Sequence, residues 1–270
     1  MIRIRGCELA YDDAGASNAL APLVWGHGLT SSRAAEDEFP LVDLGRVRED
    51  RRVVRYDARG HGQSGDLGDP ADGNWDRLAL DQVALIDELG IERVVLGGAS
   101  MGTATALHSA PLLGERLEKL VLVIPPTAWE TRREQSQAYE QMASIVETKG
   151  VEPLIAASAN LAPPDPFVEV ADTYRQRRAD GMRAADPQRL AAVFRGATGA
   201  DLPPAHEVAA IAVPTLILAW SGDPGHPVST AELLEELLPD TELVVASTLD
   251  QLATWTDRVR SFLASSLADR

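Results

Sequence analysis

The segment at residues 98–102 (GASMG) constrains this chain more than any other, because it joins two kinds of secondary structure. The apolar residues 94–96 (VVL) before it predict a buried strand, and residues 103–107 (TATAL) after it are compatible with a helix. A serine in so sharp a turn needs neighbours without Cβ atoms, so that the strand and the helix can approach each other. The pattern predicts that Ser100 is a nucleophile.

The start of the predicted helix supplies a second chemical feature. The first backbone N–H groups of a helix have no acceptor within it. The N–H of Met101 is therefore available to stabilise a developing oxyanion. The alternative interpretation is that Ser100 only caps the helix.

Short β-rich segments alternate with longer helical patterns along the chain, which predicts a mostly parallel sheet with helices on both faces. Several of these segments are continuous runs of Val, Ile and Leu, typical of central parallel strands. Eight strands are expected, at residues 2–5, 8–12, 22–25, 52–56, 93–96, 119–124, 214–220 and 242–246.

The stretch between the sixth and seventh expected strands contains no convincing strand pattern. Its apolar residues, for example Tyr139 and Met142, recur at helical spacing, and several prolines divide it into separate helices. We predict a helical lid at residues 126–208, inserted into a core made of residues 1–125 and 209–270. Arg175, Arg177 and Arg178 are interpreted as a solvated helix face.

Charge and composition exclude several classes of function. The 270 residues include 41 acidic and 25 basic side chains, a net charge of −16 that disfavours nucleic acid and anionic membranes. Cys7 is the only cysteine, so no disulfide framework or zinc site is expected. Residues 1–5 lack the apolar core of a signal peptide, and no apolar run is long enough to span a bilayer. A cytoplasmic protein is expected.

Together with two further segments, the serine turn resembles the α/β-hydrolase fold superfamily over essentially the whole chain. Residues 25–29 (WGHGL) are similar to that family's His-Gly segment after the third strand. The resemblance implies that the backbone N–H of Leu29 joins that of Met101 in an oxyanion hole. Residues 56–65 (YDARGHGQSG) resemble a structural turn of the family. Three side chains of this turn are interpreted as scaffold: Asp57, Arg59 and Ser64.

The family resemblance also implies an acid after the strand that follows the lid. Asp223 lies just beyond the expected strand at residues 214–220 and is our candidate. The residues after it, Pro224 and Gly225, also suit a turn-forming aspartate with no catalytic role. Both interpretations remain open at this point.

The histidine that the family places after the final strand is absent. Residues 244–252 read VVASTLDQL, and no histidine follows residue 226. A Ser-His-Asp mechanism needs a base that titrates near neutrality and an acid that orients it. An aspartate is ordinarily a weaker base than imidazole by about two to three pKa units, so Asp250 is no easy substitute.

His226 is the histidine best placed to replace the missing base. Residues 223–226 (DPGH) have the pattern of a type II turn, which would bring the two end Cα atoms within about 7 Å. We predict that Asp223 orients His226 and that His226 contacts Ser100. The alternative is that His226 transfers no proton. The other histidines are weaker candidates: His27, which is expected to support the oxyanion loop, His61, His108 and His206.

The sequence therefore predicts a serine hydrolase that acts on a carboxylic ester or lactone of an apolar small molecule through a Ser100 acyl-enzyme. No cofactor and no metal are expected, and the oligomeric state is left undetermined. One alternative is a cofactor-free lyase, isomerase or decarboxylase on the same fold. Another is a ligand-binding protein without catalysis.

Overall fold

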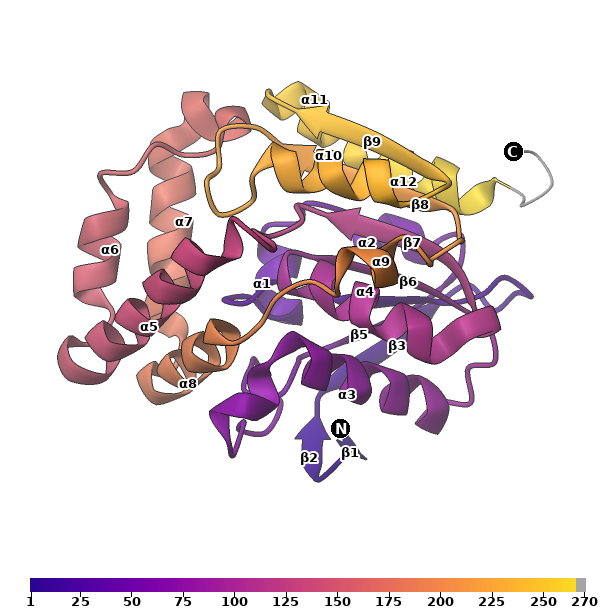
Figure 1. Ribbon diagram of the computed structural model, residues 1–270, viewed down its shortest axis with the longest axis horizontal. Coiled ribbons are helices and arrows are strands. Elements are labelled where there is room, and N and C mark those ends of the chain that lie inside the picture. Colours follow the sequence, from indigo (N-terminus) through magenta and orange to yellow (C-terminus); the bar gives the residue numbers. More distant parts are fainter. Residues whose placement is uncertain (266–270) are drawn as a thin grey trace.

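The computed structural model describes residues 1–265, and its centre is a seven-stranded sheet (Figure 1). In spatial order the strands are β3 (Tyr11–Gly15), β5 (Arg52–Tyr56), β4 (Leu23–Gly26), β6 (Val94–Ala99), β7 (Leu117–Val123), β8 (Thr215–Trp220) and β9 (Thr241–Ala246). Strand β3 pairs antiparallel with β5, and every other pair in the sheet is parallel. The predicted mostly parallel α/β fold is confirmed.

The prediction of eight strands in one sheet is wrong at the N-terminus. Strands β1 (Ile2–Ile4) and β2 (Cys7–Leu9) form a separate hairpin, whose turn places Arg5 and Gly6 at positive φ. The segment expected at residues 8–12 divides at Ala10 between β2 and β3. There the Ala10 N–H donates to the Ser64 hydroxyl, and its carbonyl accepts from the Asp57 N–H. The backbone of Ala10 thus bonds to a distant loop, which interrupts the strand.

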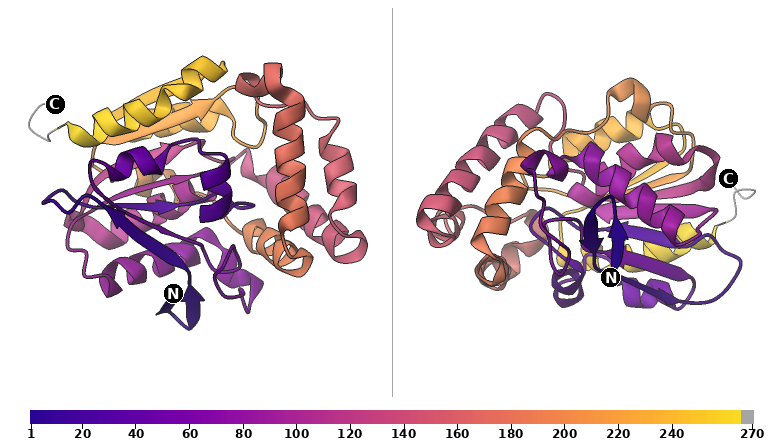
Figure 2. Two further views of the ribbon diagram at one scale, coloured as in Figure 1. Left: turned by 180° about the vertical axis from the view of Figure 1, so that it is seen from behind. Right: turned by 90° about the horizontal axis from the view of Figure 1, so that it is seen from below.

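Alternating side chains of the strands build a hydrophobic core on each face of the sheet. Leu96 and Leu122 belong to one core, and their strand neighbours Val95 and Val123 belong to the other. The first face is covered by α3 (Trp75–Glu88), α4 (Met101–Leu113) and α10 (Val228–Leu237), and the second by α2 (Leu44–Arg48) and α12 (Trp255–Ala264). Figure 2 shows the sheet between these two layers.

A group of helices between β7 and β8 stands beyond one end of the sheet (Figure 1, left). They are α5 (Arg132–Lys149), α6 (Glu152–Ser158), the 3-10 helix η3 (Asp165–Val170), α7 (Ala171–Ala184) and α8 (Pro187–Thr198). The buried Arg132 ties α5 to the end of α8, because its guanidinium donates to the carbonyls of Ala197 and Ala200. It also lies over the Trp75 ring, 4.1 Å from the centroid, which joins this group to α3.

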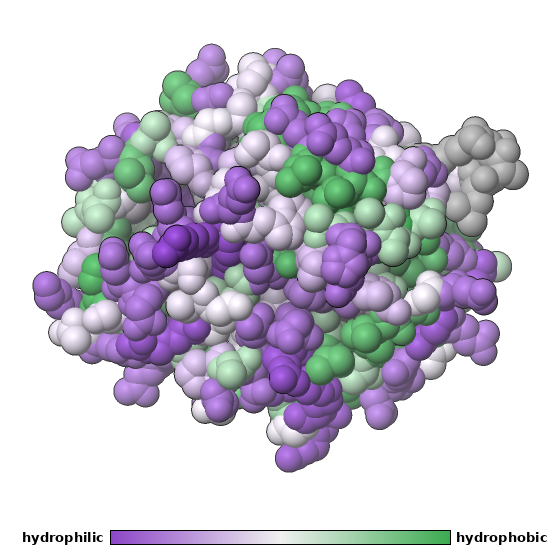
Figure 3. Space-filling view, in the orientation of Figure 1, coloured by the Kyte–Doolittle hydropathy of each residue, from purple (hydrophilic) through white to green (hydrophobic). Residues whose placement is uncertain are grey.

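The remaining helices are short. They are α1 (Arg33–Glu38), η1 (Pro70–Gly73), η2 (Gly114–Arg116), α9 (Ala205–Val208) and α11 (Leu249–Ala253). In the part of the chain that the structure describes, no helix combines the length and the apolar character needed to cross a membrane. On the face in Figure 3, hydrophilic residues separate the hydrophobic areas.

Three glycines let β4, β6 and α4 come into backbone contact. A Cβ atom on Gly102, in the first turn of α4, would lie 2.0 Å from the carbonyl oxygen of Gly26 on β4. A Cβ atom on Gly98 would lie 2.6 Å from the same oxygen. No side chain fits at positions 98 and 102, as the sequence pattern predicts, and the helix is held directly against the sheet.

We expect Gly102→Ala to destabilise the protein strongly, because its new methyl group meets a backbone oxygen that no side-chain rotation can relieve. Overpacking of this kind lowers the free energy of unfolding by about 1–3 kcal/mol or more. Urea unfolding followed by circular dichroism measures this loss. The matched control is Gly181→Ala in α7, where a Cβ atom meets no heavy atom within 4 Å. Alanine there favours the helix by about 1 kcal/mol. Equal stability of the two variants would contradict the backbone-contact argument.

Candidate active site

Ser100 occupies a strained turn between β6 and α4. Its φ of 51° and ψ of −107° are unusual for a residue with a side chain. The Ser100 N–H donates to the carbonyl of Val123 at 2.9 Å, and the hydroxyl of Thr103 lies 3.0 Å from the Gly98 carbonyl oxygen. Strain of this kind persists only where the surroundings impose it. These bonds and the glycine contacts fix the direction of the Ser100 side chain.

The structure brings the three predicted residues Ser100, His226 and Asp223 together. The Nε2 atom of His226 lies 2.9 Å from Ser100 Oγ, and its Nδ1 atom lies 2.8 Å from Asp223 Oδ2. Since a carboxylate only accepts hydrogen bonds, Nδ1 carries the proton and donates, and Nε2 accepts from the serine hydroxyl. The imidazole of His226 thus bridges the Ser100 hydroxyl and the Asp223 carboxylate.

The turn that pairs Asp223 with His226 differs from the predicted one. The His226 N–H donates to the Asp223 carbonyl at 3.1 Å, so the turn closes as expected. Gly225 does not adopt the positive φ of a type II turn, whereas Gly222, just before the turn, has a φ of 79°. The Asp223 carboxylate accepts from the Gly225 N–H at 2.8 Å, and this bond favours the observed turn over type II.

Asp223 is held as an anion although it is largely buried. Burial alone would raise its pKa, but hydrogen bonds from His226, the Gly225 N–H and the Trp220 indole lower the pKa to about 2. The indole Nε1 of Trp220 donates to Asp223 Oδ2 at 3.0 Å. We did not predict this role for Trp220 from the sequence. The available signal was an indole donor at the end of a strand, three residues before the acid.

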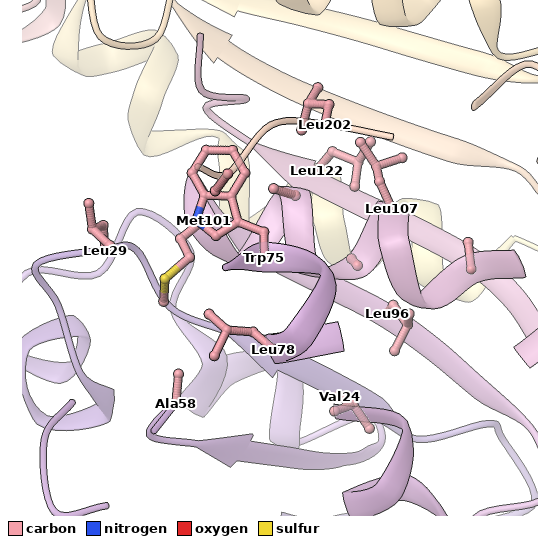
Figure 4. Packing of buried hydrophobic residues seen from close by; sticks show 14 of the residues in the cluster. Val24, Leu29, Ala58, Trp75, Leu78, Leu96, Met101, Leu107, Leu122 and Leu202 are labelled. Carbon is pink, nitrogen blue, oxygen red and sulfur yellow. The ribbon is translucent and has the colours of Figure 1, made fainter. Parts of the chain in front are cut away.

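The two N–H groups expected to form an oxyanion hole are those of Leu29 and Met101. Within residues 1–265 neither donates a hydrogen bond to another protein group. Both side chains are packed in the buried cluster around Trp75 and Leu78 (Figure 4), which fixes their backbone. A Cβ atom on Gly28 would lie 3.8 Å from Ser100 Cβ, so this loop runs beside the serine.

Two buried histidines hold the loop that carries Leu29. His27 lies with Nδ1 2.8 Å from the Gly28 carbonyl oxygen, and its Nε2 accepts from the Ala58 N–H at 3.0 Å. Burial and the neighbouring His61 lower the pKa of His27 to about 4, so the ring is neutral. Because both its nitrogens are engaged, His27 has no lone pair for a substrate proton. It supports the loop, as the sequence interpretation held.

His61 fixes the other side of the same loop. Its Nε2 lies 2.6 Å from the Leu29 carbonyl oxygen and its Nδ1 lies 2.9 Å from that of Arg59. Burial lowers the pKa of His61, which favours the neutral ring. The Gly28 carbonyl also accepts from the Ser31 N–H at 3.0 Å. In a planar trans peptide the N–H points opposite to the C=O, so the bonds to the Gly28 carbonyl set the direction of the Leu29 N–H.

The other residues considered from the sequence do not join this group. His108 lies 2.9 Å from the Asp201 carbonyl oxygen, and His206 is exposed on α9. Asp250 is exposed at the start of α11. Of these three, none makes a hydrogen bond with Ser100 in the part of the chain that the structure describes. Across those same residues, no cluster of three or more His, Cys, Asp or Glu side chains is suited to a metal ion.

The segment between β7 and β8 braces the turn that holds Asp223. The Thr127 N–H donates to the Gly225 carbonyl at 3.1 Å, and the Asp165 N–H donates to the Ser221 carbonyl at 2.9 Å. Asp165 packs so closely that a Cβ atom on Gly222 would lie 2.3 Å from its carboxylate. The position of the acid therefore depends on this helical segment as well as on β8.

Comparisons with known proteins agree with the fold. The profile of the alpha/beta hydrolase family matches residues 23–259. A 3-oxoadipate enol-lactonase of Acinetobacter baylyi is 28% identical over 190 residues, which cover 70% of this chain and 68% of the relative. A putative carbamate hydrolase of Pseudomonas savastanoi is 27% identical over 228 residues, covering 80% of this chain and 83% of the relative.

Solved structures give the same result. The crystal structure of the enol-lactonase from Burkholderia xenovorans superposes with a TM-score of 0.82 at 22% identity, covering 98% of this chain and 99% of that one. The chain belongs to the α/β-hydrolase family. The prediction that it is an enzyme of this family is confirmed.

We expect Asp223→Asn to lower the free energy of unfolding by about 2 kcal/mol near pH 7. The pKa of Asp223 is about 2 in the folded protein, against an ordinary value of 3.8. Its contribution is therefore fully present above about pH 4 and is lost as the pH falls toward 2. Urea unfolding at several pH values should show a difference between wild type and variant that narrows below about pH 4.

The matched control for this measurement is Asp250→Asn, at an exposed carboxylate on α11. Its effect on the free energy of unfolding should be small. A difference for Asp223→Asn that stays constant from neutral pH down to about pH 3 would contradict the assignment of a depressed pKa.

Proposed function

We propose that the protein is a serine hydrolase that acts on a carboxylic ester or lactone of a largely apolar small molecule. The observation that carries the proposal is the contact of Ser100 Oγ with His226 Nε2 at 2.9 Å, with Asp223 bonded to the opposite ring nitrogen. The proposed base lies on the loop after β8, in the same turn as the acid. It replaces the histidine that the family places after the last strand.

In the proposed mechanism Ser100 Oγ attacks the carbonyl carbon while His226 Nε2 takes the hydroxyl proton. The resulting oxyanion accepts hydrogen bonds from the N–H groups of Leu29 and Met101. His226 then gives its proton to the departing alkoxide, and an acyl-enzyme remains on Ser100. A water molecule repeats the attack with His226 as the base, which releases the carboxylic acid and restores the hydroxyl. In a lactone the departing alkoxide stays attached to the acyl chain throughout, and the last step releases a single hydroxy acid.

Ionised Asp223 supports both halves of this cycle. It holds the imidazole in the tautomer whose Nε2 is free to accept a proton, and its negative charge stabilises the imidazolium that forms. The Trp220 and Gly225 donors keep this carboxylate charged. The names of the lactonase and hydrolase relatives support attack on a carbonyl carbon.

We propose further that residues 126–208 form a lid over this site. Two observations support it: the hydrogen bonds of Thr127 and Asp165 to the acid-base turn, and an aromatic series from the segment to the site. Tyr174 of α7 stacks on Phe167 at 4.6 Å, Phe167 meets the Trp220 ring edge-on at 5.5 Å, and Trp220 meets His226 edge-on at 5.9 Å. Phe167 and Trp220 are buried, so these rings pack the segment against the turn that carries Asp223 and His226.

We expect a fluorophosphonate probe to label the wild-type protein at Ser100, located by peptide mass spectrometry. Ser100→Ala should not be labelled. His226→Ala should lose about 10³-fold or more in kcat on para-nitrophenyl butyrate, because no other base among residues 1–265 contacts the hydroxyl. Steady-state absorbance measurements give both kcat and KM.

The control for hydrolysis is Asp250→Ala, which should keep wild-type turnover because its side chain is exposed outside the site. Near-wild-type turnover by folded His226→Ala would overturn the proposed base. Absence of labelling, while a reference serine hydrolase reacts, would overturn the proposed nucleophile. Labelling at Ser100 without turnover of any ester or lactone would favour the lyase or isomerase alternative.

A further inference from the structure

Helix α8 is fixed against the segment that precedes α3 (Figure 1). A Cβ atom on Gly196 of α8 would lie 2.8 Å from the carbonyl oxygen of Pro70 in η1, so the two backbones are in contact. At the end of α8, the Gly199 carbonyl accepts from the Asn74 side-chain amide at 3.0 Å. The second half of α8 is therefore held on η1 and on the residue before α3.

Arg189 holds the first turn of α8 to the loop after β5. Its Nη1 atom donates to the Gly62 carbonyl at 3.0 Å, and its Nη2 atom donates to the carbonyls of Ser64 and His61, to the latter at 3.5 Å. Its Nε atom lies 2.9 Å from the Asp66 carboxylate. One side chain thus contacts the backbone carbonyls of three residues in a single turn.

The guanidinium is suited to this contact because of its shape and charge. It has five N–H donors in a planar fork and accepts no hydrogen bond. Hydrogen bonds from a charged donor are stronger than those between neutral groups, and only 28% of the Arg189 side chain is exposed, so water replaces these bonds poorly. A lysine ammonium is a point charge and could not reach all three carbonyls at once.

The loop that Arg189 holds also contacts the segment that carries Leu29. The Nε2 atom of His61 lies 2.6 Å from the Leu29 carbonyl oxygen. The Asp57 carboxylate, at the start of the same loop, accepts from the backbone N–H of Arg33 at 2.8 Å. Since these two contacts lie at Leu29 and shortly beyond it, a shift of the loop after β5 would move the Leu29 peptide.

We propose that Arg189 is a positioning residue for the proposed oxyanion hole, acting through His61 on the Leu29 peptide. The inference rests on the proposed hydrolase function and extends it to α8, which becomes a support of the oxyanion loop. The negative charge on the carbonyl oxygen develops only during the reaction. A displaced Leu29 N–H therefore weakens the transition state more than the bound ester, and the loss appears in kcat rather than in KM.

The first test is Arg189→Met, which removes the guanidinium and keeps an unbranched apolar side chain. We expect kcat on para-nitrophenyl butyrate to fall about 10- to 100-fold with KM within about twofold of wild type, since a misplaced group can cost about 10²-fold. Arg189→Lys should retain part of the lost activity. The matched control is Arg195→Met on the same helix, whose arginine pairs with Glu140 and Glu147 of α5, and its kcat should equal that of the wild type.

Chemical rescue separates positioning from a loss of stability. Arg189→Ala leaves room for a free guanidinium ion, so guanidinium chloride well below denaturing concentrations should raise its kcat several-fold over sodium chloride at equal ionic strength. The same salt weakens folding and would not restore a variant that is merely destabilised. Circular dichroism shows that each variant is folded in the assay.

Butyl trifluoromethyl ketone measures the oxyanion hole without turnover. The Ser100 Oγ atom bonds to its carbonyl carbon, the hydroxyl proton passes to His226, and the carbonyl oxygen becomes the oxyanion. Fluorine NMR of the adduct gives its dissociation constant. We expect Arg189→Met to raise this constant by about the factor by which it lowers kcat, because both report the same stabilised oxyanion.

The outcomes distinguish the role of Arg189 from the proposed function. In a folded Arg189→Met variant, a higher KM with unchanged kcat, or an equal loss in Arg195→Met, would overturn the positioning role. If the wild type forms the adduct but hydrolyses no ester, the proposed function fails and the adduct alone decides the role of Arg189. If the wild type hydrolyses the ester and the adduct is equally strong in Arg189→Met, only the role of Arg189 fails.

Discussion

The contact between the backbones of β4, β6 and α4 is the constraint on which the rest of the site depends. Gly102 and Gly98 both meet the carbonyl oxygen of Gly26 at distances that exclude a side chain. Because the helix lies directly on the sheet, the chain must turn sharply between them, and Ser100 takes a strained φ of 51°. The strain is sustained by a sheet whose central strands are buried except at Glu118. The Ser100 hydroxyl is therefore held in place before any ligand binds.

The site also requires that Asp223 stay charged although it is largely buried. Three hydrogen-bond donors meet this requirement. A buried carboxylate is costly unless hydrogen bonds replace its water, and here they come from His226, Gly225 and Trp220. Two of the donors lie in the same turn as Asp223 and the third lies three residues before it. This local arrangement explains how the imidazole can lie on the loop after β8, because Asp223, His226 and most of the hydrogen-bond donors come from one short segment.

The parts of the fold that depend on local patterns could be predicted from the sequence. Alternating apolar runs identified the strands of the main sheet, and the glycine spacing around Ser100 identified the turn. The strand count was wrong because the backbone of Ala10 bonds to Asp57 and Ser64, partners some fifty residues away that no local pattern reveals. The turn type was wrong because a side-chain hydrogen bond, from the Gly225 N–H to Asp223, competes with backbone preference.

The helical segment between β7 and β8 packs against the turn that carries Asp223 and His226. Asp165 holds the backbone of Ser221, and Phe167, two residues later, packs against the ring of Trp220, which itself donates to Asp223. Tyr174 of α7 in turn stacks on Phe167. A substrate that contacts this segment would thus contact the element that positions Asp223. In the proposed hydrolase, binding energy from the remote part of the substrate would then help to align the reacting carbonyl with Ser100.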